Sequence, residues 1–214
     1  MNLAEKIVLM SIQKDTGKIY QKATYFMRYG LISAILIELI NRKKVGVDGN
    51  KIYVMDSSKT GDTVLDMVLE TIKKKRRIDN FIFGNTTIKS KAKKEILRKF
   101  VDDCIVQEKE ERFLILFKLK RYPIYNDKEK NTIEGKVRDT LLNDDKDNEA
   151  IILTSLAVSC MAEFLILSKE EKKKIKEKLK LIRKAQYYKF EDDIMKMIQK
   201  AISRAISSEH VAAG

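Results

Sequence analysis

The sequence has few of the residues that divide a chain or carry catalytic chemistry. It holds one proline, eight glycines and no tryptophan in 214 residues, and no stretch rich in Gly, Ser or Pro separates one part from another. We therefore expect a single domain. Two cysteines, Cys104 and Cys160, lie in apolar helical patterns without metal-ligand spacing, which predicts buried free thiols in a reducing compartment. The one histidine, His210, lies near the C-terminal end and is assigned no role.

Motifs for catalysis are missing as well. The sequence has too few histidines for a histidine-dependent triad or a zinc site. Its scattered glycines form neither a phosphate-binding loop nor a dinucleotide fingerprint. The acidic segment 143–150 fails as a calcium loop, because Ala150 and Leu156 stand where a glycine and a bidentate glutamate are required. The adjacent Asp102 and Asp103 do not face each other on a helix. We therefore predict a protein that is not an enzyme and that uses no cofactor and no metal.

Hydrophobic runs long enough for a membrane span are also scarce. Residues 31–40 are apolar apart from two side chains, but a bilayer span needs about 20 such residues. Residues 148–167 are apolar nearly all round, yet glutamates flank and interrupt them, which favours a central buried helix over a membrane span. Because two apolar helices need each other to cover their surfaces, residues 24–41 and 149–167 are predicted to be buried neighbours.

The periodicity of apolar residues predicts a mainly α fold: a single domain with central buried helices surrounded by amphipathic helices, plus small β-hairpins. The expected helices cover residues 3–13, 22–41, 62–77, 90–105, 131–142, 148–167, 169–184 and 190–205. A first hairpin, the wing, spans 45–54 and turns at Asp48, Gly49 and Asn50, which supply positive φ. A second hairpin is expected to join 104–106 through a turn at 107–111 to a strand at 112–119.

The ends of the chain are assigned from composition. The N-terminal segment has no basic region and carries Glu5 in its apolar stretch, so we expect no signal peptide and a cytoplasmic protein. We expect the domain to span residues 1–207 and residues 208–214 to form a disordered tail, because the last residues are small, polar and aperiodic.

Positive charge is the strongest compositional signal. The chain has 44 Lys and Arg against 31 Asp and Glu, a net charge of +13. This balance favours nucleic acid, anionic lipid or an acidic protein surface as partner. Basic residues cluster at 73–77, 89–99 and 169–184. Such clusters are either solvated faces or, where several share one face, a surface that attracts an anionic membrane.

The order of these features resembles the Golgi phosphoprotein 3 family, together with its prokaryotic homologues. The resemblance covers residues 3 to about 167 and lies in the segments "LAEKIVLMSIQKDTGK", "GLISAILIELINRKKV", "TGDTVLDMVLETIKK", "LRKFVDDCIVQEKEERFLILFKLKRYPI" and "AIILTSLAVSCMAEFLI". It implies a mostly helical domain around a four-helix core, peripheral to the membrane. It also implies an adaptor that binds phosphatidylinositol 4-phosphate, links the membrane to protein partners and catalyses no reaction. In the eukaryotic family the location is the cytosolic face of the Golgi.

The sequence departs from the family where the lipid headgroup binds. Eukaryotic members carry a tryptophan and, nine residues later, an arginine, and the matching positions here are Ala23 and Ile32. The long apolar hairpin that the family inserts into membranes is shortened here to residues 143–149. A prokaryotic homologue is the simplest explanation of both departures. Binding of a lipid headgroup then needs other residues in place of the family's ligands, and we predict that these are Arg28, Arg121, Lys130 and Lys136.

Two functions remain open at this point. The first is a peripheral membrane adaptor on the cytoplasmic membrane face, with anionic phospholipid as partner and with membrane-protein cytoplasmic tails or a second copy of the chain as further candidates. The second is a basic nucleic-acid-binding module, since helix-and-wing units on a basic chain can dock on duplex phosphates. The resemblance and the few aromatic residues suited to base stacking place nucleic acid second.

Overall fold

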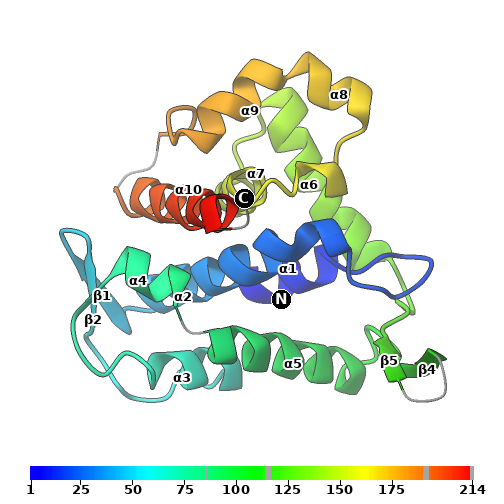
Figure 1. The fold of residues 1–214 in the computed structure, drawn as a ribbon, viewed down its shortest axis with the longest axis horizontal. Coiled ribbons are helices and arrows are strands. Elements are labelled where there is room, and N and C mark those ends of the chain that lie inside the picture. The colour runs from blue at the N-terminus through cyan, green and yellow to red at the C-terminus, as the bar shows by residue number, and fades with distance from the viewer. Residues whose placement is uncertain (85, 114–116, 190–192, 213–214) are drawn as a thin grey trace.

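The structure is a computed structural model that describes residues 1–84, 86–113, 117–189 and 193–212. Within these residues the fold is mainly α, with two small antiparallel sheets (Figure 1). The first half contains α1 (Leu3–Met10), the 3-10 turn η1 (Gln21–Ala23), the π-helical turn η2 (Phe26–Gly30), α2 (Leu31–Asn41), α3 (Thr63–Leu69), α4 (Ile78–Phe83) and α5 (Thr86–Asp102). The second half contains α6 (Lys128–Asn143), α7 (Asn148–Ser159), the 3-10 turn η3 (Glu163–Leu165), α8 (Lys169–Lys174), α9 (Lys176–Arg183) and α10 (Ile194–Ala212).

Side-chain caps start several of these helices. Asn2 and Glu5 form a capping box at α1, in which each side chain binds the other residue's backbone N–H. Asp62 accepts hydrogen bonds from two backbone N–H groups of α3. Asp147 caps α7 in the same way, and Ser168 caps α8. These caps satisfy N–H groups that have no partner inside the helix.

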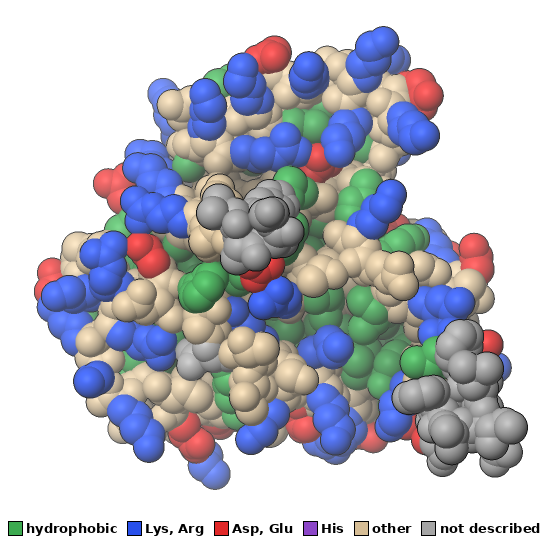
Figure 2. Space-filling view, viewed as in Figure 1, with side chains coloured by type: hydrophobic (Ala, Val, Ile, Leu, Met, Phe, Trp, Pro, Cys, Tyr) green, Lys and Arg blue, Asp and Glu red, His purple; other side chains and the backbone are tan. Residues whose placement is uncertain are grey.

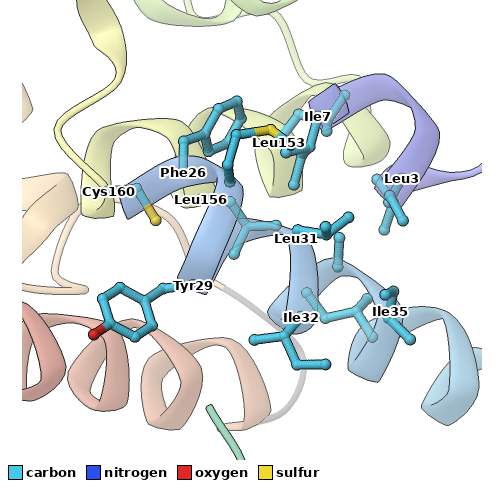
Figure 3. Close-up of a cluster of buried hydrophobic side chains, with 14 of the residues drawn as sticks. Leu3, Ile7, Phe26, Tyr29, Leu31, Ile32, Ile35, Leu153, Leu156 and Cys160 are labelled. Atoms are coloured by element: carbon cyan, nitrogen blue, oxygen red, sulfur yellow. The ribbon is translucent and has the colours of Figure 1, made fainter. Parts of the chain in front are cut away.

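One hydrophobic core runs through both halves of the chain, from Leu3 to Ile206. Figure 3 shows its centre, where Phe26 and Leu31 lie close to Leu153 and Leu156. The turn η2 contacts α7, and most residues of both are buried. This confirms the predicted packing of residues 24–41 against 149–167 in one core.

One helical segment of the described residues, Gln21–Asn41, is long and apolar enough to cross a membrane. However, 72% of its most apolar window is buried inside the protein, as in a core helix. The burial is consistent with the sequence argument that residues 31–40 belong to the core.

The predicted wing is correct but larger than expected. Strands β1 (Val45–Asp48) and β2 (Lys51–Val54) pair antiparallel, and Gly49 at the turn has φ of 56°. A third strand, β3 (Arg76–Arg77), pairs with β2. The prediction of one helix over 62–77 is therefore wrong after Leu69, because the chain leaves α3 and returns to the wing.

The second predicted hairpin has the wrong register. Strand β4 (Lys109–Phe113) pairs with β5 (Phe117–Arg121), whereas Val106 bridges to Ile124. The expected turn at 107–111 is therefore largely strand, and part of the expected strand, residues 114–116, lies outside the described residues. In the observed register Glu110 lies opposite Lys120, and Arg121 forms an ion pair with Glu111.

Three further expectations are corrected. The apolar helix ends at Ser159 instead of 167, and Met161 in the following turn has φ of 57°. Cys160 is buried as predicted, but Cys104 is exposed and lies in a left-handed turn after α5. The expected disordered tail is helical through Ala212, where α10 continues. Residues 213–214 lie outside the described residues.

Candidate functional site: a basic groove along α5

The structure places the four predicted headgroup residues in different surroundings. Lys130 lies in the interior, where its side chain is 1% exposed. Its ammonium group donates hydrogen bonds to the carbonyls of Leu9 and Met10 at 3.0 and 2.7 Å and pairs with Glu134 at 2.7 Å. These three bonds occupy all three N–H donors. Burial lowers the pKa of Lys130, and Glu134 opposes that shift. Lys130 is therefore a structural residue, and its assignment to a lipid site is corrected.

The other three predicted cations also have acidic partners. Arg121 pairs with Glu111 at 2.5 Å, and Lys136 pairs with Asp147 at 3.2 Å. Arg28 pairs with Glu209 at 2.9 Å. The partners of the four residues lie on four different segments: α1 with α6, β4, the α7 cap, and α10. The contacts give no sign that these residues share one site.

The two positions that replace the family's headgroup ligands are apolar and hidden. Ala23 lies in η1 and Ile32 in the first turn of α2, and both are fully buried. Neither residue can bind a headgroup. Any anion site must therefore use other residues.

A groove of about 740 Å³ lies along α5, between this helix, the segment before η1 and the end of β5. Leu97 and Val101 of α5 face Ile19 and Tyr122 across it. The polar residues that line the groove are Ser90, Lys93, Lys94, Arg98, Glu108 and Lys120. In Figure 2 the space between α5 and α1 shows hydrophobic side chains bordered by Lys and Arg. The groove thus combines an apolar floor with a basic edge.

The cations of the groove differ in how far they are neutralised. Arg98 pairs with Glu95 at 2.5 Å and with Asp102 at 3.0 Å. Lys120 pairs with Glu108 at 2.7 Å, and this hydrogen bond raises the pKa of Lys120. Among the described residues, Lys93 and Lys94 form no ion pair. These two lysines are therefore the positive charges of the groove that remain available to a ligand.

Tyr122 adds a hydroxyl to the groove. Burial raises the pKa of Tyr122, and the nearby charge of Glu108 raises it further. The phenol is therefore protonated at neutral pH and able to donate a hydrogen bond. It lies on the opposite side of the groove from Lys93 and Lys94, which come from α5.

The sequence showed that segment 89–99 is basic but did not indicate which of its lysines can contact a ligand. Lys89 proves to be buried, because it begins the apolar stripe that continues through Ala92, Ile96 and Phe100. Lys130 begins a stripe of the same spacing, through Ile133, Val137 and Leu141. A lysine that begins an apolar stripe with this spacing lies in the interior. The spacing is therefore a sequence signal that distinguishes interior lysines from the lysines that line the groove.

The fold and the groove define a mainly helical protein with one core and a basic, partly apolar groove on its surface. The described residues contain no group of three or more His, Cys, Asp and Glu side chains that could hold a metal ion. The model of the family Golgi phosphoprotein 3 (GPP34) matches residues 3–207, and the chain belongs to this family. A search of curated proteins gave no match to the chain.

Proposed function

We propose that this protein is a peripheral membrane adaptor that binds anionic phospholipid through the groove along α5. It acts on the cytoplasmic face of a membrane, by binding and without catalysis. The observation that carries this proposal is that Lys93 and Lys94, beside an apolar floor, have no ion-pair partner among the residues that the structure describes. Membership of the Golgi phosphoprotein 3 family supports a role of this kind.

The physical basis is the attraction of a basic surface to an anionic bilayer. Each Lys or Arg near such a surface contributes about 1 kcal/mol, so two unpaired lysines contribute about 2 kcal/mol. The apolar residues Leu97, Val101 and Ile19 can contact the less polar part of a lipid next to its phosphate. Since Ala23 and Ile32 are buried, we propose recognition of anionic lipid in general, without the family's phosphatidylinositol 4-phosphate specificity.

The wing is a weaker candidate for binding nucleic acid than its sequence indicates. Several of its basic residues are paired with carboxylates in or near the wing: Lys44 with Asp56, Lys75 with Asp48, and Arg77 with Asp79. These pairs reduce the positive potential that a duplex would meet. We therefore do not propose nucleic-acid binding, and the experiment below tests for it as an alternative outcome.

The test is flotation with phosphatidylcholine vesicles, with and without phosphatidylglycerol, beside a duplex DNA gel shift at the same salt concentration. The double variant Lys93→Ala/Lys94→Ala is expected to bind the anionic vesicles about 30-fold more weakly, the equivalent of about 2 kcal/mol. Raised salt should shrink the difference. Lys173→Ala/Lys176→Ala is the matched control, because both lysines are exposed, lack an ion pair among the described residues and lie far along the chain from α5.

The outcomes separate the alternatives. A much smaller loss from the control pair supports the groove. Equal losses from the two pairs would show that the membrane responds to net charge alone. Binding to the duplex without binding to anionic vesicles would replace the membrane proposal by a nucleic-acid function.

A protein partner completes the adaptor role. We propose that the surface outside the groove holds the cytoplasmic tail of a membrane protein or a second copy of the chain. Crosslinking of vesicle-bound protein, compared with protein free in solution, distinguishes a second copy from a different partner.

A further inference from the structure

The end of α10 places a carboxylate on a cluster of cations near the start of α2. Glu209 accepts from Arg28, with Nη1 lying 2.9 Å from Oε1 and 3.1 Å from Oε2, and it also accepts from the Tyr29 hydroxyl. Figure 3 shows the ring of Tyr29 extending toward α10. Arg28 and Glu209 are 181 residues apart in the sequence. The contact therefore exists only because of the tertiary fold.

The cluster contains more positive than negative charge. The Lys89 ammonium lies 4.8 Å from the centroid of the Tyr29 ring, and the Arg28 guanidinium lies 5.5 Å from the same centroid. Lys89 is 5% exposed and donates hydrogen bonds to the carbonyls of Ile82 and Phe83 at 2.6 and 3.1 Å. Two cations thus share one ring, with the single carboxylate of Glu209 beside them.

The local backbone explains why neighbouring side chains converge. Arg28 and Tyr29 are consecutive, and consecutive residues of an α-helix point in different directions. Here they lie in the π-helical turn η2, and both contact the same carboxylate. Turns of this kind are rare and occur frequently at functional sites.

We propose that Arg28, Tyr29 and Lys89 form a binding site for a phosphate monoester, and that Glu209 is an internal competitor which occupies this site. A guanidinium N–H and a phenol O–H bind the oxygens of a carboxylate and of a phosphate in the same way. A phosphate monoester carries a charge of about −1.5 to −2 at neutral pH, against −1 for Glu209. It therefore balances both cations, whereas Glu209 balances one.

The position of Glu209 near the end of α10 keeps the free energy of releasing it from the site small. Among the residues of α10 whose burial the structure describes, those that belong to the core are Met195, Ile198, Ala201, Ile202, Ala205 and Ile206, and all of them precede Glu209. The side chain of Glu209 is 25% exposed and lies in the last turns of the helix. Helix ends open more easily than helix centres. The last turns can thus leave the site while the rest of α10 stays in place.

The cluster includes Lys89 at the start of α5, and later residues of the same helix line the groove. Lys89 points into the interior, whereas Lys93, four residues later, lines the groove. The phosphate monoester can come from a lipid such as phosphatidic acid or from a soluble ester. The lipid source rests on the proposed membrane function, whereas the soluble source does not.

The test is calorimetric titration with glycerol 3-phosphate, which contains the phosphate monoester without a lipid. Glu209→Gln removes the competing charge and keeps the size of the side chain. We expect this variant to bind glycerol 3-phosphate at least about tenfold more tightly than the wild type, within the range usual for coupled sites. Glu70→Gln is the matched control, because Glu70 is exposed and the net charge changes equally. The double variant Arg28→Ala/Glu209→Gln should lose the gain.

A second measurement uses the wild-type protein, in case Glu209→Gln does not fold. Saturation with glycerol 3-phosphate should speed the hydrogen exchange of backbone amides in residues 207–212 and leave residues 195–206 protected. Unchanged exchange with the probe bound overturns the competition. Equal affinities of Glu209→Gln and Glu70→Gln for the probe overturn it as well.

Vesicles distinguish the two sources of phosphate. Glu209→Gln should gain more affinity for vesicles with phosphatidic acid than for vesicles with phosphatidylglycerol, whose phosphate is a diester. Tight binding of glycerol 3-phosphate without this gain supports the site and assigns it to a soluble ester. The variant Lys93→Ala/Lys94→Ala tests the groove separately, because its effect on vesicles does not depend on the glycerol 3-phosphate titration.

Discussion

Replacing Lys130 by Met tests whether this lysine is a structural residue or a lipid ligand. Its ammonium group binds the carbonyls of Leu9 and Met10 and the carboxylate of Glu134. Leu9 and Met10 are the last residues of α1, whose final carbonyls have no partner inside the helix. The cation therefore closes the end of α1 and attaches it to α6. Met fills nearly the same space but provides none of these bonds.

The expected loss of stability is large. A hydrogen bond to a charged group contributes about 1.5–3 kcal/mol, and breaking a buried ion pair by removing one partner costs about 3–5 kcal/mol. We therefore expect Lys130→Met to lower the free energy of unfolding by about 3–5 kcal/mol. For a chain of this size that corresponds to a fall in Tm of about 6–20 °C.

Urea denaturation followed by circular dichroism is the assay, and the midpoint should fall without a change in the slope m. Lys136→Met is the control on the same helix, because its ion pair with Asp147 is exposed and should contribute at most about 1 kcal/mol. At a temperature where Lys130→Met is folded, its binding to anionic vesicles should equal that of the wild type. A stability loss below about 1 kcal/mol, or a loss of vesicle binding as large as that of the groove variant, would refute the structural role.

Three further predictions concern the turn at Gly17, the two cysteines and the buried Lys89. Gly17→Ala should lower the free energy of unfolding by at least about 2 kcal/mol in the same assay, because φ is +63° and an added Cβ would lie 2.3 Å from the backbone nitrogen of Pro123. Cys104 should react with a maleimide in the native protein, and Cys160 only after unfolding, since Cys160 is buried and burial raises its pKa; equal labelling rates would contradict this. Burial and the charge of Arg28 lower the pKa of Lys89 to about 8, although Glu209 opposes the shift, so the native state binds fewer protons than the unfolded state between pH 8 and about 10.5. The stability of the wild type relative to Lys89→Met should therefore rise across this window, by at most about 3 kcal/mol, and a constant or falling difference in urea denaturation would contradict the shift.

Much of the fold was predictable because it depends on local patterns. The wing turn at Gly49 and the apolar run before Asn41 follow from residue types and spacing within a few positions. The pairing of the second hairpin was not predictable, because the polar segment 107–111 has the composition of a turn, whereas most of it pairs as strand β4 with β5. The end of α7 at Ser159 also needed the fold, since the apolar sequence continues past the turn at Met161.

The sequence by itself determined the helical class, the single core, the excess of positive charge and the family. It could not determine which basic residues remain available to a ligand. Lys130 binds carbonyls about 120 residues away, and Arg28 binds Glu209, which lies 181 residues away. Within the described parts of the chain, Lys93 and Lys94 have no ion pair. Hydrogen bonds and ion pairs act over a few ångströms in space, and the packing of distant helices sets those distances. The availability of each charge was therefore decided by the tertiary structure.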